Sequence, residues 1–158
     1  MRVGLTGHQQ RSGIDWDWTL DTLARELESL GSPIEGWSML AVGADQIFAE
    51  IVLELGGTIV TVVPGPWYEH CFDGATLPAY RDLLGRGEIV TLAEAQGDDG
   101  FRAGGLKVVD STEMLIAVWD GQPGDGRGGT GDIVEYALSV GRPVIHLQPI
   151  DRTVERLG

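Results

Sequence analysis

The chain has 158 residues, of which 42% are hydrophobic, and a formal net charge of −13. This length and apolar content predict one folded domain over 1–158. The charge argues against nucleic-acid and membrane partners, because the 11 basic residues are scattered along the chain. The single Cys71 excludes an internal disulfide, and no secretory leader or apolar run of ~20 residues is found, so we expect a cytoplasmic protein.

Hydrophobic periodicity predicts strands and helices that alternate along the chain. The expected order is strand 2–5, helix 16–30, strand 37–42, helix 45–55, strand 58–63, helix 75–84, strand 88–92, helix 101–110, strand 114–119, a helix that begins near residue 130, and strand 144–147. Gly104 and Gly105 weaken the helix over 101–110. About six strands with intervening helices predict an α/β fold with a Rossmann-like, doubly wound and mainly parallel sheet that carries helices on both faces.

The segments that follow the strands predict the binding site, because ligands of such sheets lie beyond the carboxyl ends of the strands where strand order reverses. These segments are Thr6-Gly7-His8-Gln9-Gln10-Arg11, Gly43-Ala44-Asp45, Pro64-Gly65-Pro66-Trp67-Tyr68, and the stretch from Asp120 to Asp132. Their combination is more specific than a single glycine-rich loop.

The last of these segments indicates a phosphate site. Residues 121–132 read GQPGDGRGGTGD, between an apolar strand and a helical pattern. The first N–H groups of a helix lack intrahelical partners and lie at the positive end of its dipole, and glycines let a phosphate come close. We expect the phosphate to bind at Gly128, Gly129, Thr130 and Gly131.

Three segments resemble the SLOG superfamily. They are GLTGH at 4–8, GADQIFA at 43–49 and GGTGDIVEYA at 128–137. The superfamily includes LOG phosphoribohydrolases, DprA/Smf DNA-processing proteins, molybdenum-cofactor carriers and nucleotide-sensing domains of antiviral systems. The resemblance spans nearly the whole chain, and it implies a Rossmann-like fold, a nucleotide or nucleotide-derived ligand, and a homodimer.

The LOG enzymes cleave the N-glycosidic bond of nucleoside 5′-monophosphates and share the motif PGGxGTxxE. This chain reads RGGTGDIVE at 127–135, so the resemblance makes Glu135 the candidate catalytic carboxylate. A carboxylate there would stabilise an oxocarbenium-like state or activate water. The arginine that LOG enzymes carry before the fifth strand corresponds to Gly104, with Arg102 two residues away. This departure argues against LOG-type hydrolysis.

The residues around the last helix also admit structural interpretations. Asp132 and Glu135 are spaced as a capping box, with Asp132 as the N-cap, and capping is compatible with catalysis. Arg127 either neutralises a ligand phosphate or is a solvated surface charge.

Two interpretations are likewise open for the polar residues of the other loops. His8 binds a phosphate or acts as a proton shuttle, or it is a turn histidine, and related proteins show Gly-His-Arg where this chain reaches an arginine only at Arg11. Asp45 is a helix N-cap or contacts a ribose hydroxyl. Asp120 contacts a sugar or a metal-bound water, or is a turn aspartate.

Aromatic residues of these loops are candidates to stack on a base. Trp16, Trp18, Trp67 and Tyr68 all have a suitable face. Trp16 is better explained as the first apolar position of its helix, and Trp67, after Pro66, is the better stacking candidate.

Two functions follow from the sequence. The first is binding of a nucleoside monophosphate or ADP-ribose-like ligand as a sensor or carrier, and the alternative is a nucleoside 5′-monophosphate N-glycoside hydrolase that uses Glu135. A DprA-like role on single-stranded DNA is set aside because of the net charge. No cofactor or metal site is identified, because Cys71 beside His70 lacks a third ligand, and a divalent cation beside the phosphate stays open.

Overall fold

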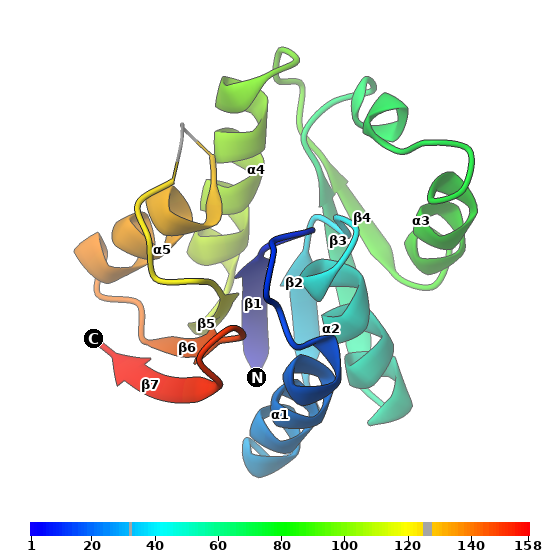
Figure 1. The fold of residues 1–158 in the computed structure, drawn as a ribbon. Coiled ribbons are helices and arrows are strands. Elements are labelled where there is room, and N and C mark those ends of the chain that lie inside the picture. The colour runs from blue at the N-terminus through cyan, green and yellow to red at the C-terminus, as the bar shows by residue number, and fades with distance from the viewer. Residues whose placement is uncertain (32, 125–127) are drawn as a thin grey trace.

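The structure is a computed structural model that describes residues 1–31, 33–124 and 128–158. Within these residues, one sheet of seven strands has the order β4-β3-β2-β1-β5-β6-β7. The strands are β1 (Arg2–Gly7), β2 (Glu35–Ser38), β3 (Thr58–Val63), β4 (Glu88–Thr91), β5 (Met114–Val118), β6 (Val144–Gln148) and β7 (Thr153–Leu157). The helices are α1 (Trp16–Ser29), α2 (Ala44–Glu54), the 3-10 helix η1 (Tyr68–Cys71), α3 (Leu77–Leu84), α4 (Asp98–Ser111) and α5 (Thr130–Ser139). The expected Rossmann-like, mainly parallel sheet is confirmed (Figure 1).

The strand order reverses at β1. The chain builds outward from β1 through β2 and β3 to β4, and then crosses back to place β5 on the other side of β1. Gly7 at the end of β1 is in register with Val118 at the end of β5, and the two strands are parallel. The switch point, where ligands of such sheets bind, therefore lies at the carboxyl ends of β1 and β5.

Helices cover both faces of the sheet, with α1 and α2 on one side and α4 and α5 on the other (Figure 1). In β5, Ile116 and Val118 belong to the core cluster that includes the buried residues of α1 and α2. Leu115 and Ala117 belong to the second cluster, with residues of α4 and α5. Because side chains of a strand alternate between faces, a strand covered on both sides is apolar throughout.

β2 and β7 are among the elements that differ from the sequence prediction. β2 begins two residues earlier than expected and ends at Ser38, because the chain then turns out of the sheet and Leu40 adopts a positive φ of 55°. β7 was not predicted, since its side chains are mostly exposed and show no apolar alternation. Its antiparallel pairing with β6 holds it in the sheet.

The glycines that weakened the prediction of α4 are sites of close packing. A Cβ on Gly104 would lie 2.6 Å from the Met39 methyl carbon, and one on Gly105 would lie 2.5 Å from Cδ1 of Ile133. The helix is therefore continuous from Asp98, three residues before the expected start, and it passes close to both the β2–α2 loop and α5. None of the helices in the described ranges is long and apolar enough to cross a membrane.

Candidate functional site

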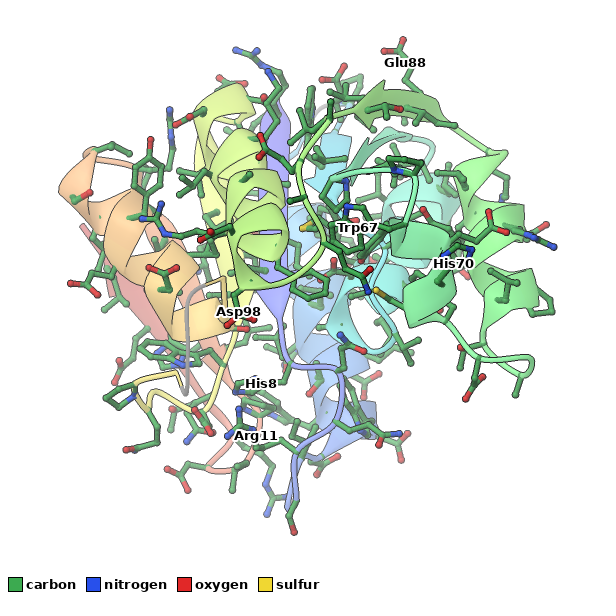
Figure 2. The ribbon with its side chains drawn as sticks, turned by 90° about the horizontal axis from the view of Figure 1, so that it is seen from above. His8, Arg11, Trp67, His70, Glu88 and Asp98 are labelled. Carbon is green, nitrogen blue, oxygen red and sulfur yellow. The ribbon has the colours of Figure 1, made fainter. Side chains whose placement is uncertain are left out.

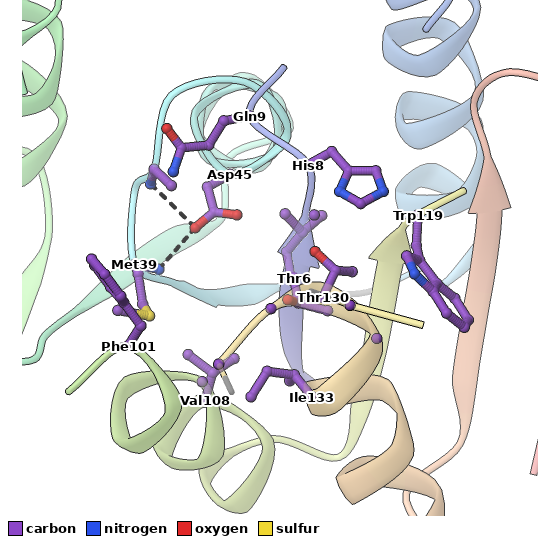
Figure 3. Close-up of a pocket in the computed structure, with 18 of the residues that line it drawn as sticks. Thr6, His8, Gln9, Met39, Asp45, Phe101, Val108, Trp119, Thr130 and Ile133 are labelled. Atoms are coloured by element: carbon purple, nitrogen blue, oxygen red, sulfur yellow. Dashed lines mark hydrogen bonds between the residues drawn. The ribbon is translucent and has the colours of Figure 1, made fainter. Parts of the chain in front are cut away.

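A cavity of about 520 Å³ lies at the switch point. It is bounded by the segment after β1, the loop between β2 and α2, α4 from Asp98 to Val108 and the start of α5. The residues predicted from the sequence that line it are Thr6, Gly7, His8, Asp45, Gly128, Gly129, Thr130 and Gly131. The structure thus brings together three segments that are far apart in the sequence (Figure 3).

The start of α5 forms one wall of this cavity. The helix begins at Thr130, and Gly129 is its N-cap without a side-chain capping bond. Helix geometry leaves the N–H groups of the first turn without intrahelical partners and places the positive end of the dipole there. Because Gly129, Thr130 and Gly131 line the cavity, this wall suits an anion.

The predicted capping box is wrong, because the N-cap of α5 is Gly129, three residues before Asp132. Asp132 lies in the first turn of α5 and is not its N-cap. Its Oδ2 accepts hydrogen bonds from the Gly128 N–H at 2.8 Å and from Arg102 Nε at 3.1 Å. Asp132 thus ties the glycine-rich turn to α4, while Arg127 lies outside the described residues.

His8 connects the segments that follow β1 and β5. Its backbone N–H donates to the Val118 carbonyl at 3.0 Å, and its Nε2 accepts from the Asp120 N–H at 3.1 Å. Burial, with the nearby positive charge of Arg11, holds the pKa of His8 below its ordinary value. Nε2 can accept a hydrogen bond only when the imidazole is neutral. The hydrogen bond therefore holds a neutral, polar ring in the lining of the cavity.

Asp120 and Arg11 lie beside His8 at the mouth of the cavity. Asp120 approaches His8 Nε2 and Arg11 Nη1, each at 3.4 Å, but does not itself line the cavity. Burial raises the pKa of Asp120, but the hydrogen bond from the Gln122 N–H and the positive charge of Arg11 outweigh it and hold the pKa below its ordinary value. Arg11 is partly exposed, and Figure 2 shows it next to His8.

The segment 43–45 serves the site through close packing. Gly43 has a φ of 97°, and a Cβ there would lie 2.6 Å from the Gln9 carbonyl oxygen. A Cβ on Gly7 would lie 2.6 Å from that of Ala44. Gly43 and Ala44 thus let the start of α2 approach the segment after β1. Neither residue lines the cavity itself.

Asp45 is not the N-cap that the sequence suggested, because Gly43 holds that position. The Asp45 carboxyl is buried and its Oδ2 accepts from the N–H groups of Met39 and Ala41, both at 3.2 Å. Burial raises the pKa of Asp45 to about 7, against the lowering effect of these two bonds. Asp45 therefore fixes the β2–α2 loop and presents an ionisable group to the cavity.

The aromatic wall differs from the prediction. Trp67 does not line the cavity: its Nε1 donates to the Glu94 carbonyl at 2.9 Å, and its ring packs edge-on against Phe101. Figure 2 shows Trp67 apart from His8, on the side of η1. Pro64 is buried and does not line the cavity, whereas Phe101, Tyr68 and Trp119 do. The sequence offered one signal for Trp119, which directly follows an apolar strand.

Glu135 is exposed and lines a second cavity of about 580 Å³, together with Leu138, Leu157 and Asp132. Gly104, at the position of the LOG arginine, packs on Met39, and the nearby Arg102 is paired with Asp132. The structure therefore does not bring Glu135 to the cavity at the switch point. The described residues also hold no group of three His, Cys, Asp or Glu side chains placed to bind a metal ion.

Solved structures share this fold. The DNA processing protein A (DprA) of Streptococcus pneumoniae matches with a TM-score of 0.70 and 18% identity, over 92% of this chain and 49% of that one. DprA of Helicobacter pylori matches with a TM-score of 0.66 and 19% identity, over 92% and 64%. The Moco carrier protein of Chlamydomonas reinhardtii gives 0.57 and 19%, over 93% and 75%. The chain therefore has the Rossmann-like fold that the resemblance to the SLOG superfamily implied.

The chain spans about half the length of the pneumococcal DprA chain. No family model and no curated protein sequence matches it. At these low identities, the likeness establishes the fold of the chain, and the function has to be argued from its own site.

The exclusion of nucleic acid as a partner is wrong. DprA of Helicobacter pylori, which has this fold, is described by its single-stranded DNA binding mode. Net charge is a property of the whole chain, whereas helix termini and single arginines set the potential at a site. The charge of −13 therefore does not decide which ligands this fold accepts.

Proposed function

We propose that the cavity at the switch point binds a nucleotide or nucleotide-derived ligand, as a sensor or carrier. The observation that carries the proposal is the start of α5, where Gly129, Thr130 and Gly131 line the cavity at the positive end of the helix. This arrangement is suited to a phosphate. Arg11 lies at the mouth of the same cavity, where it adds positive charge.

The rest of the cavity suits the other parts of a nucleotide. Its volume of about 520 Å³ lies in the usual range of small-molecule sites, roughly 300 to 1,000 Å³. Phe101 and Tyr68 supply aromatic surface, which favours a flat base. His8 and Asp45 supply fixed polar groups for orientation. The named functions of the structural neighbours, single-stranded DNA binding and carriage of the molybdenum cofactor, are compatible with such a ligand.

Substitution of Gly129 tests the proposal. Its φ of −73° and ψ of 167° are ordinary for any residue, so Gly129→Val keeps the backbone while adding bulk at the phosphate position. The control is Gly74→Val, since Gly74 has no atom within 4 Å of a built Cβ. Thermal unfolding is measured with AMP, GMP, CMP, ADP-ribose and NAD. At about 100 times the dissociation constant, binding stabilises by about 2.7 kcal/mol, which is a shift of roughly 5–10 °C.

The expected result is such a shift for the unchanged protein and for Gly74→Val, and none for Gly129→Val. An equal shift in Gly129→Val contradicts a phosphate at the start of α5. Chromatography of each mixture tests the alternative, N-glycoside hydrolysis. We expect intact nucleotide, whereas free base that disappears in Glu135→Gln would establish the hydrolase.

A further inference from the structure

Asp45 is the buried group of the cavity that phosphate binding leaves without a role. Its side chain is 5% exposed. Both hydrogen bonds that it accepts, from Met39 and Ala41, are at Oδ2. Within the described ranges, Oδ1 has no hydrogen-bond partner. Figure 3 shows it turned away from these bonds toward the interior of the cavity. A carboxylate oxygen accepts two hydrogen bonds, so Oδ1 has unused capacity inside the site.

The surroundings of Asp45 are those of a base rather than a phosphate. Met39 and Phe101 lie with it on one side of the cavity, and His8 and Trp119 lie on the other (Figure 3). Tyr68 also lines the cavity, and the charge of Asp45 acts on its phenol. An anion beside a buried carboxyl is disfavoured by repulsion, whereas a flat group with a hydrogen-bond donor satisfies both the apolar wall and the unused oxygen.

We propose that Asp45 is a specificity-determining residue that accepts a hydrogen bond from the exocyclic amino group of a nucleobase, which lies against Phe101 while its phosphate lies at α5. This inference rests on the proposed function and adds the class of base. An amino-bearing base satisfies Oδ1, and an analogue that lacks the amino group leaves the carboxylate buried without a partner. The free-energy cost of leaving a buried charged acceptor without a partner exceeds the net stabilisation from an average hydrogen bond.

The discrimination depends on pH in a defined direction. Burial raises the pKa of Asp45 to about 7, so the carboxyl is ionised at pH 8.5 and protonated at pH 5.5. The amino donor binds the ionised form, and preference for it therefore falls as the pH is lowered. Among the residues that the structure describes, the other titratable or charged residues of the cavity are His8, Arg11, Tyr68 and Asp98. Their effects and that of the ligand phosphate cancel when two nucleotides that share the phosphate and the sugar are compared.

The test is calorimetric titration at pH 8.5 of AMP, purine riboside 5′-monophosphate, which lacks the amino group, dAMP and ribose 5-phosphate. The unchanged protein is compared with Asp45→Asn and with the control Asp21→Asn, which removes an exposed carboxyl of α1 that does not line the cavity. We expect AMP to bind roughly ten- to a hundredfold more tightly than purine riboside 5′-monophosphate, as for a hydrogen bond to a charged group. This ratio should persist in Asp21→Asn and fall to about one in Asp45→Asn, with the affinity for ribose 5-phosphate unchanged.

An equal ratio in the unchanged protein and in Asp45→Asn overturns the role of Asp45 but leaves the proposed function intact, because nucleotides still bind. Absence of binding by every compound overturns the proposed function itself. Loss of affinity on going from AMP to dAMP, with no dependence on the amino group, means that the carboxyl contacts the sugar and overturns the assignment to the base. Should Asp45→Asn not fold, the unchanged protein decides: a ratio that is the same at pH 5.5 and 8.5 also contradicts the inference.

Discussion

Asp45 shows that the role of a residue depends on the path that the surrounding backbone takes. Its place in a Gly-Ala-Asp segment predicted a site residue, and the structure places it in the lining of the cavity. The N-cap interpretation failed because the side chain turns back to the N–H groups of Met39 and Ala41, whose path is set when Leu40 takes a positive φ. The prediction that Trp67 stacks on a base differs from the structure for a related reason. Phe101, from α4, lines the cavity and packs against the Trp67 ring, which does not line it.

Asp45 should also make stability depend on pH. Its pKa rises from 3.8 to about 7 on folding, so the protonated carboxyl is favoured in the folded state. The resulting stabilisation is fully present below about pH 4 and is lost as the pH rises through 7. Urea unfolding from pH 5 to 8 should show the unchanged protein losing stability relative to Asp45→Asn, by at most about 1.4 kcal/mol per pH unit. A difference that is constant over this range contradicts the buried carboxyl.

At the scale of elements, the alternation of strands and helices could be predicted because each segment carries its own periodicity. β3 has the predicted bounds, and α5 begins at the predicted residue. β7 could not be predicted, since an exposed edge strand is defined by the edge it pairs with. α4 was underestimated because glycine lowers helix propensity, whereas here Gly104 and Gly105 allow α4 to pack against Met39 and α5.

The contact between α2 and the segment after β1 predicts a large effect at Gly43. Gly43→Ala adds both an unfavourable positive φ and a Cβ within 2.6 Å of the Gln9 carbonyl oxygen. Gly56→Ala is the matched control, because Gly56 has a φ of 80° and no atom within 4 Å of a built Cβ. Backbone strain alone costs roughly 1–3 kcal/mol, so we expect denaturant unfolding to show a clearly larger loss for Gly43→Ala. Equal losses would show that the contact is not needed.

At the scale of the whole molecule, the site follows from topology. The sequence predicted that loops after several strands meet at one place. The pairing of β1 with β5 puts this place at the carboxyl ends of these two strands. Composition was a poor guide to partners, because 24 acidic and 11 basic residues describe the whole chain and not the cavity. Likewise, the motif placed Glu135 near the glycines in sequence, but the turn of α5 directs it to the second cavity.

The excess of negative charge predicts that salt stabilises the fold. Several exposed arginines, such as Arg86 and Arg156, already pair with carboxylates, and the remaining carboxylates repel one another. Screening weakens both effects, but exposed pairs contribute little and the net charge is −13. The melting temperature at pH 8 should therefore rise between 0.02 and roughly 0.3 M KCl, where the Debye length falls below about 10 Å. A fall over this range would show that the ion pairs outweigh the repulsion.

The most direct test of the central claim is a crystal structure of the protein with the nucleotide that stabilises it most. We predict the phosphate at the N–H groups of Gly129, Thr130 and Gly131, and the base beside Phe101 and Asp45. A nucleotide bound in the second cavity, beside Glu135, or elsewhere on the surface would contradict the account.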